Sequence, residues 1–285
     1  MKVIPSVHKY WHDFKYWPKY WRIKRRIHDY RPQPVTIGSI KTWLQQFEEK
    51  DRKALLALLD KVVYLSEKNT EKLLVELNNS LLHRLNESQI PPKNIIYVQI
   101  HEAGSSSPVM LNMIRDRALL QRKGCHFIDS KDVRALNELT NKLGNGAIIY
   151  VDDFAGTGHQ FCEVRDFVAP YIVGNFSEFF LLACICEEAL YKLGKRGVEA
   201  VSGYIHAKAA RPLHPNSSML APAIKNRLVE LCLEIDGWRG LGYRNLASMV
   251  VLYRNSPDSV PLILRGSLKQ TPWVGVLPRT TDLPY

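Results

Sequence analysis

Between residues 95 and 206, short apolar runs alternate with longer segments in which apolar residues recur every three or four positions. Runs of about four to eight apolar residues bounded by polar residues indicate buried strands, whereas the longer periodic segments indicate helices. The expected strands cover residues 95–100, 125–128, 147–151, 179–186 and 200–206, and the expected helices cover 109–122, 132–143, 160–170 and 187–193. Strands separated by helices of this length indicate an α/β fold with a parallel sheet and helices on both faces.

A different pattern precedes this region. From residue 39 onward, apolar residues, mostly leucine, recur at helical spacing, and Ser39 is a candidate N-cap for the first helix. The pair Pro91-Pro92 marks the boundary with the alternating region. We therefore expect a helical cap at residues 35–90, with a packing role, ahead of an α/β core at residues 91–255.

The pattern becomes less regular near the end of the chain. Residues 221–233 indicate a helix and residues 247–253 indicate a strand. The last segment is rich in Pro, Gly and Trp and resembles a lid more than a core element. We place this lid at residues 256–285.

Charge adds a feature at the N-terminus. The formal net charge is +11, and residues 1–34, with nine Lys or Arg against two Asp, carry +7 of it. Aromatic residues are interleaved with these cations without a clean period, and Pro18 interrupts them. Such a basic aromatic tail can stack on bases and neutralise phosphates. Docking on the chain's own domain or on a protein partner is an equal alternative, because Trp, Tyr and Arg also dominate protein interfaces.

Composition excludes several classes of protein. The chain is 46% hydrophobic, but no run approaches the roughly 18 apolar residues that a membrane-spanning helix needs. The N-terminus lacks the apolar core of a secretory signal. The spacing of the five cysteines fits no zinc pattern, so we expect buried, reduced thiols and no metal-ligating set of side chains. We expect a cytoplasmic protein that does not contact a membrane.

The residues that carry chemistry follow the predicted strand 147–151. Asp152 and Asp153 are followed by Gly156-Thr157-Gly158 and by a helix that starts near Gln160. Glycines let the backbone turn its N–H groups toward an anion, and the helix N-terminus adds its positive end. This pattern predicts a phosphate site with two carboxylates about one sugar away, suited to the 2′ and 3′ hydroxyls of a ribose. A structural strand-to-helix turn and a mononucleotide site of another fold remain alternatives.

This motif resembles the signature of the phosphoribosyltransferase family: an apolar strand, two acids, a short spacer and Thr-Gly. The resemblance implies a site for 5-phosphoribosyl 1-diphosphate (PRPP), in which Asp152 and Asp153 hold the ribose hydroxyls. The residues implied to hold the 5-phosphate are Gly156, Thr157, Gly158, His159 and Gln160. The loop after the first core strand is implied to hold the diphosphate, through Ala103, Gly104, Ser105, Ser106 and Ser107. It also implies magnesium bound through the diphosphate and the ribose hydroxyls.

The sequence departs from the family pattern at three places. Gly156 stands where many members have an acid or Thr, and Gln160 replaces the usual Thr. Members that act on pyrimidines often have a flexible catalytic loop where this chain has the helix-like segment 133–143. Standard base salvage is therefore not expected, whereas sugar-phosphate binding is. Among smaller features, His159 is either a phosphate contact or an exposed loop residue.

A closer resemblance covers nearly the whole chain after the basic tail. Its elements are Trp43-Leu44-x-x-Phe47, the loop 101–108, Asp-Asp-Phe-x-Gly-Thr-Gly-x-Gln, and residues 255–261 with Trp273 and Arg279. The chain is similar to phosphoribosyltransferase-like proteins of bacterial anti-phage systems, including retron-associated effectors.

This closer resemblance implies a toxic antiviral effector that acts on a nucleotide by Mg-dependent transfer or hydrolysis at the anomeric carbon. The alternative is a non-catalytic nucleotide sensor that docks onto a nucleoprotein complex, such as a reverse transcriptase with its nucleic acid, through residues 1–34. Gly156 favours the sensor, because it offers no side chain near the leaving group. The paired acids and the serine loop favour the enzyme.

Overall fold

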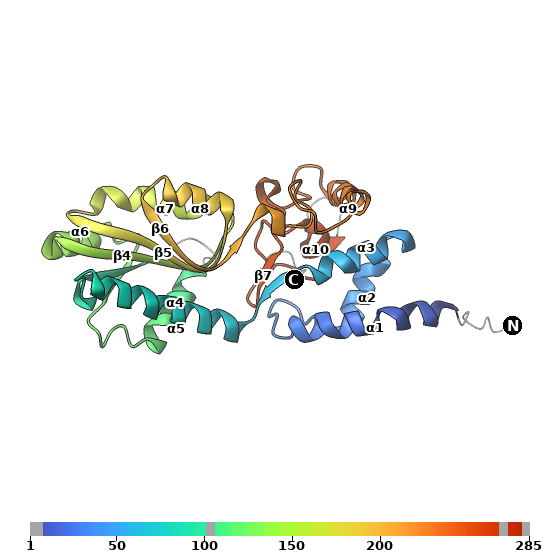
Figure 1. The fold of residues 1–285 in the computed structure, drawn as a ribbon, viewed down its shortest axis with the longest axis horizontal. Coiled ribbons are helices and arrows are strands. Elements are labelled where there is room, and N and C mark those ends of the chain that lie inside the picture. Colours follow the sequence, from blue (N-terminus) through green and yellow to red (C-terminus); the bar gives the residue numbers. More distant parts are fainter. Residues whose placement is uncertain (1–7, 101–105, 268–272, 281–285) are drawn as a thin grey trace. The chain divides into compact units, whose positions relative to one another are not determined.

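The computed structural model describes residues 8–100, 106–267 and 273–280, with only the backbone of 8–15, Ser267 and Trp273 (Figure 1). The chain forms two compact units. Residues 67–210 form the first, which we call the sheet unit. Residues 1–66 and 211–285 together form the second, which we call the composite unit. These units divide the chain at other positions than the four segments expected from the sequence.

A parallel five-stranded sheet is the centre of the sheet unit. Its strands are β2 (Ile95–Gln99), β3 (His126–Asp129), β4 (Asn145–Ala155), β5 (Asn175–Cys186) and β6 (Val198–His206). They lie in the order β3-β2-β4-β5-β6. From β2 the chain adds β3 on one side, and it then crosses over to add β4, β5 and β6 on the other side, so the strand order reverses between the neighbouring strands β2 and β4. The expected α/β fold is confirmed. In such a sheet, ligands bind beyond the carboxyl ends of the strands at this reversal, the topological switch point.

Helices cover both faces of this sheet (Figure 1). The helices α4 (Glu67–Glu87) and α5 (Ser107–Arg117) cover one face. The helices α6 (Val133–Leu143), α7 (His159–Val168) and α8 (Glu187–Gly194) cover the other face. The 3-10 turns η1 (Pro92–Asn94), η2 (Ala169–Tyr171) and η3 (Lys208–Ala210) complete the unit. The core under α7 includes Phe161, whose ring stacks on Phe180 of β5 at 4.1 Å between centroids.

The two central strands are longer than the sequence pattern indicated. β4 continues four residues beyond Val151 and therefore includes both acids of the motif. Its ladder with β5 persists there, with Asp152 opposite Leu182 and Phe154 opposite Cys184. Acidic residues are unfavourable in buried strands and so indicate a strand end in the sequence, but backbone pairing to a fully buried neighbour overrides that preference.

The composite unit is built from both ends of the chain. Its N-terminal elements are α1 (His8–Arg26), α2 (Ile37–Gln45), α3 (Glu49–Asp60) and β1 (Val63–Leu65). Its C-terminal elements are α9 (Pro222–Ile235), η4 (Tyr243–Asn245), β7 (Val250–Leu252), α10 (Leu262–Arg265), β8 (Gly266–Ser267) and β9 (Trp273–Val274). β1 pairs in parallel with β7, and β8 pairs antiparallel with β9. α2 begins at a capping box in which Thr36 is the N-cap, so the expectation that Ser39 caps this helix is wrong.

The basic N-terminal segment, where its side chains are described from residue 16 onward, is a core element and not an appended tail. α1 continues through Pro18, and its residues Tyr20 and Ile23, with Ile27 directly after its end, are buried in the same cluster as residues of α2, α3 and α9. The buried Tyr30 hydroxyl donates to the carbonyl of Pro278 at 2.6 Å. The sequence left open whether this segment binds nucleic acid or packs against its own domain. Its core-facing side chains pack against their own domain.

The described part of the C-terminal segment is also core and not the expected lid. Ile263, Val276 and Leu277 are fully or almost fully buried. The Trp43 indole N–H donates to the carbonyl of Ile263 at 2.8 Å, which ties α2 to α10. All five cysteines are buried free thiols, as expected. In the part of the chain that the structure describes, no helix is both long and apolar enough to cross a membrane.

Candidate functional site at the switch point of the sheet

Ser106 brings the two acids of the motif together. It is the N-cap residue of α5, directly after the loop that follows β2, yet its side chain makes no capping hydrogen bond. Instead its hydroxyl contacts Asp152 Oδ1 and lies 2.7 Å from Asp153 Oδ1. Serine at an N-cap ordinarily accepts a hydrogen bond from the first turn of its helix. Here the Ser106 side chain contacts the two acids of β4 instead.

The two carboxylates form a concentrated negative site. Asp152 and Asp153 are 7% and 9% exposed, and the backbone N–H of Asp153 donates to Asp152 Oδ1 at 2.9 Å. Neighbouring side chains of a regular strand point to opposite faces, but both of these carboxylates reach the same hydroxyl. One hydroxyl carries one proton and can donate to one carboxylate at a time. The two carboxylates therefore share the single Ser106 proton at the carboxyl end of β4.

The glycine motif has the geometry expected of an anion cradle. Gly158 is the N-cap of the ten-residue helix α7 and has φ of 68°, in the left-handed region that favours glycine. A Cβ at this position would lie 3.0 Å from Ala189 Cα and 3.1 Å from Ala189 Cβ. Backbone conformation and space both require glycine here. The positive end of α7 thus lies a few residues beyond the acid pair, as phosphate binding would require.

The remaining residues of the motif differ in their environment. His159 is partly exposed, and its Nε2 lies 3.4 Å from Glu163 Oε1, one turn further along α7. The backbone N–H of His159 approaches Thr157 Oγ1 at 3.4 Å, which is a weak contact at best. Gln160 is exposed. The structure thus places the His159 ring beside an acid on the surface of the helix.

The loop after β2 is described only at its end. Ala103, Gly104 and Ser105 lie outside the described residues. Ser107 is fully buried, and its hydroxyl accepts a hydrogen bond from the backbone N–H of Ile100 at 2.9 Å. This hydrogen bond joins the residues on either side of 101–105, and the expected contact of Ser107 with substrate stays a prediction.

The expected absence of a side-chain metal cluster is compatible with a magnesium site. No group of three or more His, Cys, Asp or Glu residues is assembled for a metal within the described residues. Asp152 and Asp153 offer oxygen atoms, the donors that magnesium prefers, and magnesium usually keeps several waters and shares its coordination with substrate phosphates. The acid pair therefore fits a magnesium ion that is held largely by substrate and water.

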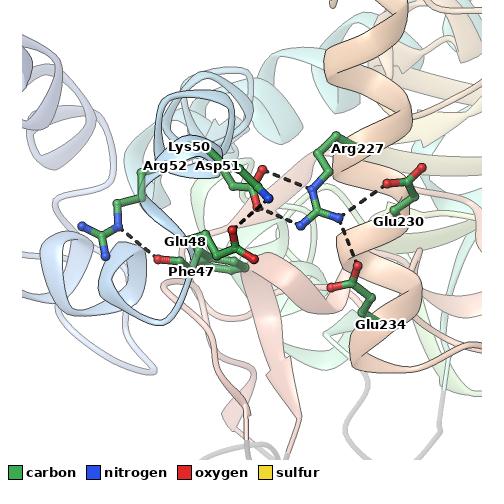
Figure 2. A network of polar contacts seen from close by, with 8 residues as sticks. All are labelled: Phe47, Glu48, Lys50, Asp51, Arg52, Arg227, Glu230 and Glu234. Carbon is green, nitrogen blue, oxygen red and sulfur yellow. Dashed lines mark hydrogen bonds and ion pairs between the residues drawn. The ribbon is translucent and has the colours of Figure 1, made fainter.

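A second polar centre lies in the composite unit, and no pattern in the sequence indicated it. Figure 2 shows Arg227 of α9 between Asp51 of α3 on one side and Glu230 and Glu234 on the other. Its Nε and Nη2 donate to the two carboxylate oxygens of Asp51 at 3.2 and 2.9 Å. Asp51 is 4% exposed, and Arg227 lowers the pKa of its carboxyl by hydrogen bonding.

A pocket of about 290 Å³ adjoins this centre. Its lining residues come from the α2–α3 turn, α3 and α9: Gln46, Phe47, Glu48, Asp51, Arg227, Leu231, Glu234 and Ile235. The guanidinium of Arg227 already neutralises part of the negative charge here, and the partners come from α3 and α9. We interpret the ion pair Asp51–Arg227 as a structural contact that joins α3 to α9 in the core of the composite unit.

The sequence offers further candidates: Trp238 and Trp273 could stack on a base, and the run 206–211 could bring cations to the carboxyl edge of the sheet. Trp238 is 82% exposed and is therefore not a packing anchor. The side chain of Trp273 lies outside the described residues. Arg211 is fully buried and donates to the carbonyl of Leu246, so it does not belong to an exposed basic cluster with Lys208.

Three comparisons relate the chain to known proteins. Among solved structures it matches orotate phosphoribosyltransferase from Aeropyrum pernix, with 16% identity and a TM-score of 0.31 over 46% of this chain and 68% of that chain. Likeness at this level carries no argument about fold or function. No curated protein matches the chain significantly. The PRTase-CE family model, in contrast, matches residues 40–279, which is most of the chain and spans both units. The chain therefore belongs to the PRTase-CE family of phosphoribosyltransferase-like proteins.

Proposed function

We propose that the sheet unit binds a ribose 5-phosphate compound, PRPP or a nucleotide, and transfers or hydrolyses the substituent at its anomeric carbon. The proposal rests on one observation at the switch point. The Ser106 hydroxyl does not cap α5 but contacts the carboxylates of both Asp152 and Asp153. The start of α7 at Gly158 follows the same strand. Family membership supports the same substrate class.

Each part of the site has a role in this reaction. The carboxylates of Asp152 and Asp153 accept hydrogen bonds from the 2′ and 3′ hydroxyls, and the backbone N–H groups at residues 156–160 hold the 5-phosphate. The bond from the anomeric carbon to its leaving group breaks, and the electron pair departs with that group. The carboxylates stabilise the positive charge that develops on the sugar.

The reaction is completed by an incoming nucleophile. A water oxygen or an acceptor nitrogen forms the new bond to the anomeric carbon and releases its proton to solvent. Gly156 has no side chain that could take this proton. Magnesium, when bound, neutralises the negative charge of a diphosphate leaving group. The acid pair orients the ribose and holds its hydroxyls at fixed positions.

The biological setting that we propose is bacterial anti-phage defence, with the chain as an effector of a retron-type system. In that setting the protein would consume a nucleotide or modify a nucleic acid, and a reverse transcriptase complex would hold its toxicity in check. This proposal rests on the sequence resemblance described above and on the same site.

The proposal is tested with purified protein, PRPP, a set of nucleotides and magnesium, with substrate loss followed by chromatography. The variant Asp152→Asn/Asp153→Asn keeps the shape of the site and removes its charge, and we expect it to lose about a hundredfold or more in rate. Asp116→Asn, at a carboxylate that is 71% exposed on α5, is the matched control. Removing magnesium with a chelator should abolish turnover of a diphosphate substrate.

The second candidate function is a nucleotide sensor without catalysis, which the absence of a side chain at Gly156 favours. The sensor predicts binding in calorimetry without loss of substrate in chromatography. The enzyme predicts both. If the wild-type protein neither binds nor consumes any of these compounds, both functions are wrong.

A further inference from the structure

The outer side of α1 carries a surface that the core does not use. The inner side of the helix buries Tyr20 and Ile23, and Ile27 directly after the helix is buried with them. Trp17 and Trp21 lie one turn apart and remain 42% and 44% exposed. Side chains three or four positions apart share one face of a helix, so these two indoles lie together on one stripe. We call this surface the tryptophan stripe, and it consists of Trp17, Trp21, Lys24, Arg25 and His28 of the α1 segment with Lys41 of α2.

Cations border both indole rings of the stripe. Lys24 Nζ lies 4.9 Å from the centroid of the Trp21 ring, and Lys41 Nζ lies 5.6 Å from the centroid of the Trp17 ring. Arg25 is exposed beside them along the helix. From Phe14 to His28 the sequence contains six Lys or Arg and no Asp or Glu. The stripe is therefore positively charged along its whole length.

The adjoining side of α1 is also rich in cations. Burial lowers the pKa of Lys19, the carboxylate of Asp60 opposes this shift, and the charges of Arg22, Lys61 and Lys53 lower the pKa further. The nearest acid, Asp60, is engaged in a two-bond contact with Arg22, at 3.2 and 2.6 Å. An anionic ligand that extends along α1 would therefore meet an excess of positive charge beside the indoles.

This combination distinguishes a nucleic acid from a protein partner. Protein interfaces are enriched in Trp but depleted in Lys, whereas here lysines stand next to both indoles. Surfaces that bind single-stranded nucleic acid combine aromatic platforms for the bases with cations for the phosphates. A duplex would hide its base faces from the indoles, so a single strand is the ligand that uses both features.

We propose that the tryptophan stripe binds single-stranded nucleic acid, with bases stacked on Trp17 and Trp21 and phosphates paired with Lys24, Arg25 and Lys41. This surface belongs to the composite unit and does not depend on the function proposed for the sheet unit. Deletion of residues 1–34 cannot test it, because the deletion would also remove Tyr20, Ile23 and Ile27 from the core. Point variants on the outer side of the helix leave that core intact.

The test measures fluorescence anisotropy of labelled oligothymidylate and oligouridylate of about 20 nucleotides with the full chain at several salt concentrations. Trp17→Ala/Trp21→Ala should weaken binding by roughly tenfold or more, since stacking on an aromatic ring contributes strongly for each base. Lys24→Gln/Arg25→Gln should reduce the slope of log affinity against log salt by about 1.4, that is, about 0.7 for each phosphate that is no longer neutralised. Trp238→Ala, at an exposed Trp of the same unit, and Arg134→Gln, at a cation that is 90% exposed on α6, are the matched controls.

Circular dichroism of each variant establishes that α1 and the core are retained. The proposal is wrong if the wild-type chain does not bind either oligonucleotide at low salt. It is also wrong if the double Trp variant binds as well as Trp238→Ala, or if an equally long duplex binds more tightly than the single strands. Loss of a copurifying protein, with oligonucleotide binding unchanged, would assign the stripe to a protein partner instead.

Discussion

The pair Asp51–Arg227 makes a prediction about the stability of the composite unit. Replacing Arg227 by Met keeps most of the side-chain volume and leaves the carboxylate of Asp51, 4% exposed, without its two hydrogen bonds. Removing one partner of a buried ion pair costs about 3–5 kcal/mol. The Arg227 side chain is 31% exposed, so water can partly replace the guanidinium, and we expect a loss of about 2–3 kcal/mol.

The assay uses a property of the sequence. All six tryptophans lie at positions 11, 17, 21, 43, 238 and 273, within the composite unit, so tryptophan fluorescence reports the unfolding of this unit selectively. With an m-value of about 2 kcal/mol/M in urea, the midpoint should fall by roughly 1–1.5 M. Lys50→Met, at an exposed cation paired with the exposed Glu48 in the same network, is the control and should leave the midpoint unchanged.

The effect of Arg227→Met should depend on pH in a defined direction. Arg227 holds the pKa of Asp51 below its ordinary value, chiefly through their hydrogen bonds. The stabilisation is therefore complete above the ordinary pKa of about 4 and is lost as the pH falls through the lower pKa of the folded state. The difference between wild type and variant should shrink as the pH is lowered toward about 3 and below. A difference at neutral pH no larger than that of Lys50→Met, or one that is larger at low pH, would refute the reasoning.

Four further predictions address the site and the thiols. Gly158→Ala should raise the dissociation constant of PRPP or nucleotide in calorimetry by at least about tenfold, because its φ of 68° and the contact with Ala189 strain the cradle; circular dichroism should be preserved. In cells, Asp152→Asn/Asp153→Asn should abolish growth arrest or phage protection, and retained protection would support the sensor. Ser106→Ala should weaken the packing of α5 against the acid pair by about 1–2 kcal/mol, measured as faster amide hydrogen exchange at the end of β4. Burial raises the pKa of Cys125 to about 11 and that of Cys232 to about 12, so a thiol reagent at mildly alkaline pH should react with these thiols only on unfolding.

The sequence was informative about the sheet because its signals are local. Each strand of the sheet unit is a compact apolar run, so Ile95–Gln99 and its neighbours could be identified without knowledge of the fold. The motif residues were found in the same way, since Asp152 to Gly158 are contiguous. The common contact of both acids with Ser106 needed the structure, although its position after the first core strand made it a reasonable candidate.

The sequence did not indicate that the two ends of the chain share one core, because the contacts that join them lie far apart in the sequence. Trp43 reaches the carbonyl of Ile263, and Asp51 pairs with Arg227, over separations of 220 and 176 residues. Short apolar groups such as Val276-Leu277 are too small to indicate a core until such partners are known. Helix α1 was not expected because Pro18 is unfavourable within a helix. Burial of the apolar residues that follow Pro18 compensates for the backbone hydrogen bond that proline cannot make.

The composite unit also has a consequence for the order in which the protein folds. During synthesis, residues 67–210 are complete and able to form their own core before residue 211 has been made. Helices α1 to α3 are synthesised before the sheet unit, but β1 can pair only after its partner strand β7 has been made, and the core that these helices share with α9 and α10 forms only then. Helices α1 to α3 therefore reach their final packing after the sheet unit. A nascent or truncated chain that ends near residue 210 would hold a finished sheet unit together with apolar helices that still lack their partners.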